Sequence, residues 1–262
     1  MEIKMNYTRA ELKGQSKELI RVSKPSVILT GAIYVVLGVV MAILSARITG
    51  ARLTAGNLMQ YYEHVENGNL DYAVRYFGTL MPTASERLMG MLLDMAYYIV
   101  TVGWYIFLLN TLRGLGATYG NLLDGFGFFW RIILLNIVIG VFVALWSLLL
   151  VIPGIIAAYR YRMAVYLLID NPDMSVMDCI RESKAMMQGH KSELFVLDLS
   201  FLGWALLTAI PYVGYLIQIW TVPYMDMTYV IYYDRLRAQT ASGSPYESNP
   251  GENWRGNPPT GY

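Results

Sequence analysis

The stretch WSLLLVIPGIIAAYRYRMAVYLLIDNP, residues 146–172, decides the fold class of this chain. It is a long apolar run that is interrupted once, at Ile152-Pro153-Gly154, and is closed by a polar turn at Asp170-Asn171-Pro172. Proline removes a backbone donor and glycine permits a tight reversal, so the interruption predicts a hairpin of two helices. Because the run at 132–145 ahead of it is also apolar, the hairpin is too apolar for a soluble surface. The stretch therefore predicts a membrane crossing and return.

The composition of the whole chain supports this interpretation. Of the 262 residues, 55% are hydrophobic and 15% are charged, and the mean hydropathy is +0.39. Soluble domains carry about 25% charged residues, so the chain is shifted toward a lipid environment. A net charge of +1 gives no electrostatic basis for binding nucleic acid. The single cysteine and the two widely separated histidines predict no disulfide, no metal site and no cofactor.

Six apolar segments are candidates for membrane-spanning helices, and a helix of about 20 residues crosses roughly 30 Å of hydrocarbon. The predicted spans are about 26–46, 88–109, 132–151, 155–169, 194–210 and 215–233. A signal peptide that ends near Ala46 is the competing interpretation of the first segment. Both that segment and the charged stretch before it are too long for one. We predict an all-α polytopic membrane protein, with about six spans in three hairpins and one transmembrane domain over 1–237.

Two segments outside the spans have the pattern of amphipathic helices at the membrane surface. Residues 1–24 carry six basic residues between apolar ones, which predicts a helix on the inner membrane surface. Residues 47–87 form the predicted outer loop, in which two short amphipathic helices flank a turn at Asn67-Gly68-Asn69. This loop is interpreted either as a cap over the helices or as a lid that binds a partner or ligand.

Two further segments are predicted to be cytoplasmic. Residues 175–188 are predicted to form an amphipathic helix, because Ser175 and Asp178 make a capping box and Gly189 can end the helix. Residues 238–262 are rich in Ser, Gly, Pro and Asn, which is typical of a disordered tail.

The basic residues predict the orientation of the chain. With both termini inside, fourteen Lys and Arg residues face the cytoplasm and four, in the segment 47–87, face outside. Cytoplasmic loops carry an excess of basic residues in multi-pass membrane proteins. We therefore expect a multi-pass protein of the bacterial cytoplasmic (plasma) membrane with both ends inside.

The sequence also contains an internal repeat. The segment 146–153, WSLLLVIP, recurs at 204–211 as WALLTAIP. A second correspondence, displaced by 167 residues, relates Glu11, Ser16-Lys17 and Lys24 to Asp178, Ser183-Lys184 and Lys191. Together they predict one unit used three times: a cytoplasmic amphipathic helix, a span out, a turn and a span back. The three units would share one orientation, which makes a parallel repeat.

Ionisable side chains inside the spans are the candidate functional residues, because placing a charge in hydrocarbon is costly. The candidate intramembrane polar site consists of Asp94, Arg160, Arg162 and Asp226. Their estimated depths predict two ion pairs, Arg160–Asp94 and Arg162–Asp226. The pairs are interpreted either as structural links that hold the helices in register, or as a polar pathway or anionic-lipid pocket. Asp198, near the inner end of its span, is interpreted as an interfacial residue.

Two classes of function follow from these features. One is a non-enzymatic membrane scaffold, accessory or envelope-related factor, with a membrane-protein partner bound through the loop 47–87 or the helix 175–188. The other is a small transporter or lipid-handling protein that uses the intramembrane charges. Phosphate loops, zinc-protease, serine-hydrolase and dinucleotide motifs are absent, so no enzyme and no catalytic residue is predicted. Besides the lipid bilayer, an anionic lipid is an expected ligand.

Four segments carry a resemblance to a known family. They are IPGII (152–156), YRYRMAVY (159–166), DNPDMS (170–175) and SKAMMQGHK (183–191). They resemble the core of a bacterial membrane-protein family catalogued as domain of unknown function 975 and, more distantly, membrane domains found beside glycerophosphodiester phosphodiesterases. The resemblance implies a helical integral membrane protein without an established activity. Arg160 and Arg162 depart from the family pattern, in which smaller polar residues are usual.

Overall fold

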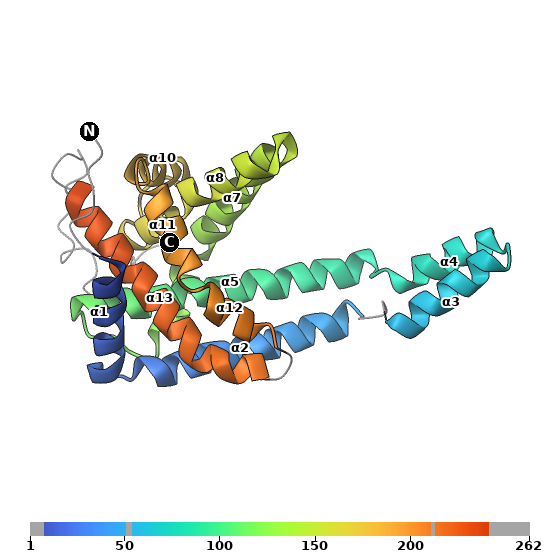
Figure 1. Cartoon of the computed structure of the whole chain (residues 1–262), viewed down its shortest axis with the longest axis horizontal. Helices are drawn as coiled ribbons and strands as arrows, with labels where there is room; N and C mark the ends of the chain where they lie inside the picture. Colours follow the sequence, from blue (N-terminus) through green and yellow to red (C-terminus); the bar gives the residue numbers. More distant parts are fainter. Residues whose placement is uncertain (1–7, 51–53, 211–212, 241–262) are drawn as a thin grey trace. The chain divides into compact units, whose positions relative to one another are not determined.

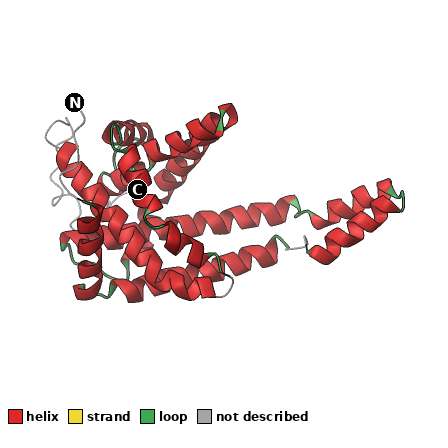
Figure 2. Ribbon diagram, in the orientation of Figure 1, coloured by secondary structure: helices red, strands yellow, loops and turns green. Residues whose placement is uncertain are grey.

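The computed structural model describes residues 8–50, 54–210 and 213–240, and every regular element in these ranges is a helix (Figure 2). The predicted all-α fold class is therefore confirmed. Within these described ranges, four helical segments are long and apolar enough to cross a membrane: Val27–Ile48, Leu70–Arg113, Asn121–Leu149 and Val151–Asp170. The predicted spans at 194–210 and 215–233 are not among them, so the count of six remains a prediction.

The chain divides into two compact units, which are described one at a time (Figure 1). The smaller unit is Val36–Tyr98, and the larger unit comprises Met1–Val35 and Ile99–Tyr262. The apolar pattern of the sequence, from which we expected one domain over 1–237, gives no sign of this division.

The smaller unit contains two helices that run on into the larger unit and two short helices between them. Its elements are the second half of α2 (Val27–Ile48), α3 (Ala55–Glu66), α4 (Leu70–Leu80) and the first half of α5 (Ala84–Arg113). α2 and α5 approach closely at Gly38, where a Cβ atom would lie 2.4 Å from the hydroxyl of Tyr97. The Tyr76 hydroxyl donates to Gln60 at 2.7 Å and so joins α4 to α3. The two short helices predicted in this loop are confirmed.

The core of the larger unit is formed where three helices meet: the second half of α5, α9 (Ala164–Asp170) and α13 (Val213–Thr240). Phe107, Leu168 and Tyr233 from these three helices are all fully buried. α13 continues through Pro223 without ending, and a Cβ atom at Gly31 of α2 would lie 2.3 Å from the proline ring. α13 also extends to Thr240, so residues 238–240 are helical, and the rest of the predicted tail lies outside the described residues.

The two apolar helices predicted within 129–161 are present, but the break between them lies earlier than the sequence suggested. α7 (Phe129–Leu149) and α8 (Val151–Tyr161) are separated by Leu150 alone, which has an extended backbone. Pro153 lies in the first turn of α8, where a missing N–H leaves no hydrogen bond unmade. Gly154 allows the two helices to touch, because a Cβ atom there would lie 2.0 Å from the Ser147 hydroxyl.

Two predicted spans are each divided by a short break. α8 and α9 are separated at Arg162–Met163, and α11 (Lys191–Leu199) and α12 (Leu202–Thr208) at Ser200–Phe201. The residues in these breaks keep near-helical backbone dihedrals, so the chain continues in nearly the same direction after each break. The breaks leave backbone carbonyls available to side chains from other helices.

α1 (Arg9–Val22) and α10 (Val176–Met186) are amphipathic helices of the larger unit. Thr8 and Glu11 form a capping box at the start of α1, and Ser175 caps α10 as predicted. The buried face of α1 packs against α13, where the Ser16 hydroxyl donates to the Tyr224 carbonyl at 3.1 Å. The expectation that this face lies on the membrane is therefore wrong for its buried residues, which contact protein.

Candidate functional site

The first candidate site, which we call the Arg162 cluster, lies at the break between α8 and α9. Arg162 Nη1 donates to Asp198 Oδ2 on α11 at 2.7 Å. The hydroxyls of Tyr159 and Tyr229 donate to the same carboxylate at 2.6 and 2.7 Å. The guanidinium also lies 4.5 Å from the centre of the Tyr229 ring. Asp198 therefore accepts three hydrogen bonds, and the cluster is electrically neutral.

This geometry corrects the predicted Arg162–Asp226 pair. The partner of Arg162 is Asp198, and Asp226 accepts a hydrogen bond from Trp104 Nε1 at 2.9 Å. Trp104 is fully buried and stacks on Tyr34 at 5.5 Å. The prediction compared depths along unbroken helices, and depth alone could not reveal that α11 lies beside the break. Asp198, interpreted as merely interfacial, is the residue that pairs.

Asp94 and Arg160, the other two candidate residues, make no contact with each other among the described interactions. Asp94 is an exposed residue of α5 in the smaller unit, whereas Arg160 belongs to α8 in the larger unit. The Arg160–Asp94 pair therefore remains a prediction. The backbone of Arg160 has a clear role, because its carbonyl accepts a hydrogen bond from the Ser183 hydroxyl of α10 at 2.8 Å.

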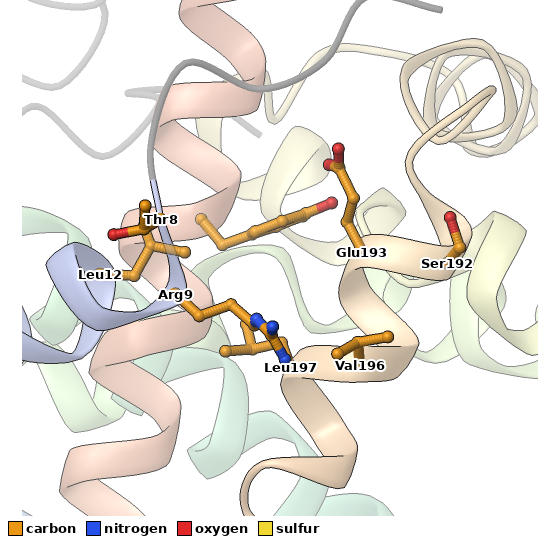
Figure 3. Close-up of a pocket in the computed structure, with 8 residues that line it drawn as sticks. Thr8, Arg9, Leu12, Ser192, Glu193, Val196 and Leu197 are labelled. Atoms are coloured by element: carbon orange, nitrogen blue, oxygen red, sulfur yellow. The ribbon is translucent and has the colours of Figure 1, made fainter.

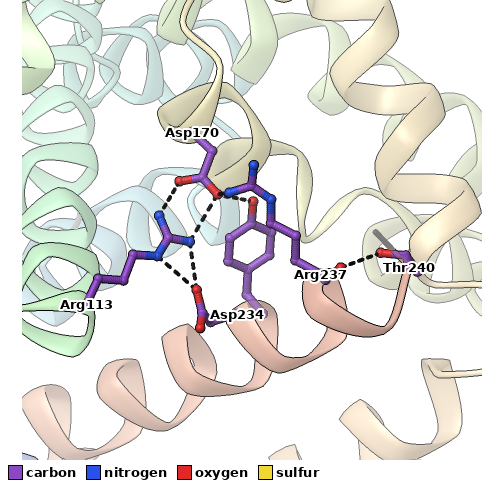
Figure 4. A network of polar contacts seen from close by, with 6 residues as sticks. Arg113, Asp170, Asp234, Arg237 and Thr240 are labelled. Atoms are coloured by element: carbon purple, nitrogen blue, oxygen red, sulfur yellow. Dashed lines mark hydrogen bonds and ion pairs between the residues drawn. The ribbon is translucent and has the colours of Figure 1, made fainter. Parts of the chain in front are cut away.

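The second site, which we call the Asp170 cluster, lies where α5, α9 and α13 meet (Figure 4). Arg113 donates from Nη1 and Nη2 to the two carboxylate oxygens of Asp170 at 2.6 and 3.1 Å. Its Nε donates to Asp234 at 2.9 Å. Arg237 and the Tyr233 hydroxyl also donate to Asp170, the latter at 2.7 Å. The side chain of Asp170 is only 2% exposed.

The Asp170 cluster consists of two arginines and two aspartates, so its formal charge is zero. A bidentate arginine fixes both distance and orientation, and here it links the ends of three helices. Among the residues that the structure describes, no group of three or more His, Cys, Asp or Glu could hold a metal ion. The arrangement is suited to fixing the positions of helices.

Sequence reasoning missed the Asp170 cluster because its residues lie just outside the predicted spans. Asp170 was assigned to a turn, and Arg113 was counted only as a cytoplasmic charge. A signal was nevertheless available: Asp170 and Asp234 each directly follow the last residue of a predicted return span. Carboxylates at the same relative position of two predicted spans are candidates for a shared partner.

Taken together, the all-helical fold, the membrane-length apolar helices and the paired charges define a membrane-type helical protein. The family model described as "Protein of unknown function (DUF975)" matches residues 1–240, so the chain belongs to this family. Neither a curated protein nor a solved structure matches the chain. The resemblance to membrane domains beside glycerophosphodiester phosphodiesterases has no match to support it.

Proposed function

We propose that the protein is a non-enzymatic scaffold or accessory module of the bacterial cytoplasmic membrane, with six spans, three hairpins and both termini inside. The observation that carries this proposal is the pairing of charges in the larger unit. The Asp170 and Arg162 clusters join their arginines to carboxylates within neutral groups. The best-attested role of ion pairs enclosed by a protein is to fix the register of packed elements, and this is the role expected in a scaffold.

The proposed threefold repeat is supported by the environments of α1 and α10. Leu12, Ser16 and Ile20 of α1 correspond, 167 residues on, to Cys179, Ser183 and Met187, and all six side chains are buried. Both serine hydroxyls donate to a backbone carbonyl of a return helix, at Tyr224 and at Arg160. Repeated contacts of this kind suit a module whose helices are held in fixed register.

The proposed route to a membrane-protein partner is α3 and α4 of the smaller unit. Met59, Tyr62, Leu70 and Val74 on these helices are between 59% and 73% exposed. The other predicted route, the helix at 175–188, offers less apolar surface, because the apolar residues of α10 are largely buried within the larger unit.

A transporter is the second candidate, and one observation favours it. Asp226 accepts a hydrogen bond from Trp104, a neutral donor, so its charge is not matched by a direct ion pair among the described residues. A carboxylate in this position could bind a proton or cation during transport.

Reconstitution in proteoliposomes tests the two functions against each other. We expect vesicles that contain the wild-type protein to show no more ion or solute flux than empty vesicles. We also expect the charge-free variant Arg162→Met/Asp198→Asn to fold like the wild-type protein. Flux by the wild-type protein that is lost in Asp226→Asn, with folding unchanged, would overturn the proposal.

Cysteine accessibility at positions 62, 118, 150 and 210 would test the six-span topology, with 118 alone expected on the cytoplasmic side.

A further inference from the structure

One side of α1 carries a row of cations that have no carboxylate partner among the residues that the structure describes. Arg9, Lys13, Lys17 and Arg21 are spaced by four residues and therefore lie along one side of the helix, beside its buried face. None of them lies within ion-pair distance of a carboxylate in the described part of the chain. We call these four residues the basic row.

The middle of the basic row is held in place by two aromatic rings. Lys13 Nζ lies 4.1 Å from the centre of the Phe201 ring, and Lys17 Nζ lies 5.5 Å from that of Tyr224. The two rings contact each other edge to face at 5.5 Å. Lys13 Nζ also donates to the Ser200 carbonyl, at the break between α11 and α12, at 3.1 Å. The two ammonium groups are therefore gathered beside this break.

This arrangement keeps like charges close together. Burial lowers the pKa of Lys13 below its ordinary value, and the charges of Arg9 and Lys17 lower it further. An anion bound between these groups would remove the repulsion and replace the water that burial has displaced.

A pocket of about 390 Å³ extends the basic row toward the start of α1 (Figure 3). Arg9 lies on one side of the pocket and Glu193 of α11 on the other, and Leu12, Val196 and Leu197 form an apolar part of the lining. Glu193 is engaged by His190 Nδ1 at 2.9 Å. The pocket therefore offers a cation, an apolar surface and an acceptor that is already paired.

An exposed apolar helix begins directly beside the lysines. α12 starts at Leu202, one residue after Phe201, and Leu202 and Leu206 are 50% and 65% exposed. A molecule that touches both Lys13 and α12 must carry a negative charge next to a hydrocarbon chain. An anionic phospholipid has this chemistry, and basic residues at a membrane surface each attract such lipids.

We infer that Arg9, Lys13 and Lys17 form a binding site for an anionic phospholipid, whose phosphate lies at the basic row and whose acyl chains lie along α12. The site shares no charged residue with either cluster, although Phe201 beneath Lys13 contacts the Tyr229 ring of the Arg162 cluster at 5.9 Å. The inference does not rest on the proposed scaffold function. Lipid binding would be a function of α1 that α10 does not share.

Native mass spectrometry of the full chain in mild detergent tests this site. We expect retained phosphatidylglycerol in preference to phosphatidylcholine, and each substitution, Lys13→Gln or Lys17→Gln, should weaken retention on the order of five-fold. Lys184→Gln is the matched control, because Lys184 is an exposed residue of α10 that corresponds to Lys17 in the repeat. It should leave retention unchanged.

Three outcomes would overturn the inference: equal retention of both lipids, equal loss in the Lys184→Gln control, or no loss in the double variant Lys13→Gln/Lys17→Gln. Displacement of the lipid by millimolar inorganic phosphate would indicate a site for a soluble phosphate compound. Lys13→Gln removes a hydrogen bond to the Ser200 carbonyl and could therefore disturb the fold. Lys17→Gln removes no hydrogen bond to the backbone of another described helix, so a loss of lipid in this variant reports on binding. A thermal unfolding curve for each variant checks that the fold is intact.

Discussion

The central carboxylates of the Asp170 cluster and the Arg162 cluster differ in how completely the protein encloses them. The Asp170 carboxylate is 2% exposed and binds two arginines and a tyrosine, whereas Asp198 and Arg162 are 24% and 35% exposed. A charge that is buried without its partner keeps its full desolvation penalty, but a half-exposed charge can recover water. The first cluster therefore holds the core of the larger unit together, and the second fixes how α11 packs against that core.

The largest effect is expected when the Asp170 carboxylate is removed. Asp170→Ala leaves Arg113 and Arg237 without their shared partner and should lower the free energy of unfolding by about 3–5 kcal/mol. Unfolding of the purified full chain in detergent measures this loss. Asp173→Ala is the control, because Asp173 is fully exposed and its removal should produce no measurable shift. Equal stability of the two variants would show that the Asp170 cluster is not a structural link.

A smaller loss is expected in the Arg162 cluster. Arg162→Ala should lower the free energy of unfolding by about 1–2 kcal/mol, because a hydrogen bond to a charged group is lost while both tyrosines still donate to Asp198. Tyr229→Phe, which removes one of those donors, is expected to have a similar or lesser effect. A loss as large as that of Asp170→Ala would remove the distinction between the two clusters.

Smaller losses of stability are expected when the hydroxyls of Ser183 and Ser16 are removed. Ser183→Ala removes the hydroxyl that donates to the Arg160 carbonyl beside the helix break and should cost about 1 kcal/mol. Ser16→Ala should cost less, because the Tyr224 carbonyl also accepts a hydrogen bond from the Thr228 hydroxyl at 2.7 Å. Ser183→Ala combined with Arg162→Ala should be less than additive if the break positions Arg162. Strict additivity would mean that the two contacts are independent.

The smallest effect is expected in the rate at which the Cys179 thiol is alkylated. Cys179 of α10 is fully buried, and burial together with the charge of Asp178 raises the pKa of its thiol to about 12. Because the thiolate is the reactive form, alkylation of the native protein at pH 8 should be very slow. Asp170→Ala should accelerate labelling more than Arg162→Ala does, in the order of their effects on stability. Rapid labelling of the wild-type protein would contradict the packing of α10.

Local features of the fold could be predicted from the sequence because they depend on neighbouring residues. The cap at Ser175, the turn at Asn67-Gly68-Asn69 and the apolar helices of the 146–172 hairpin are examples. The placement of the hairpin turn was wrong by a few residues. Pro153 is compatible with both the turn and the first helical positions, and the close contact of Gly154 with Ser147 decides between them.

The candidate site was only partly predictable. Arg162 was chosen correctly as an unusual residue, because the cost of a charge in an apolar segment can be read from sequence alone. Its partner was wrong, because pairing depends on which helix lies next to the break between α8 and α9. The Asp170 cluster was missed for the related reason that its members belong to three helices far apart in the chain.

The sequence by itself determined that this chain is helical, apolar and a member of a family without assigned function, since composition, periodicity and motifs are properties of short segments. The tertiary structure decided which charges meet and which stay unmatched. Arg113, Asp170 and Asp234 are brought together by three helices, and the cations of α1 have no carboxylate partner among the described residues and lie beside an exposed apolar helix. Long-range electrostatic contacts depend on geometry that no single segment encodes.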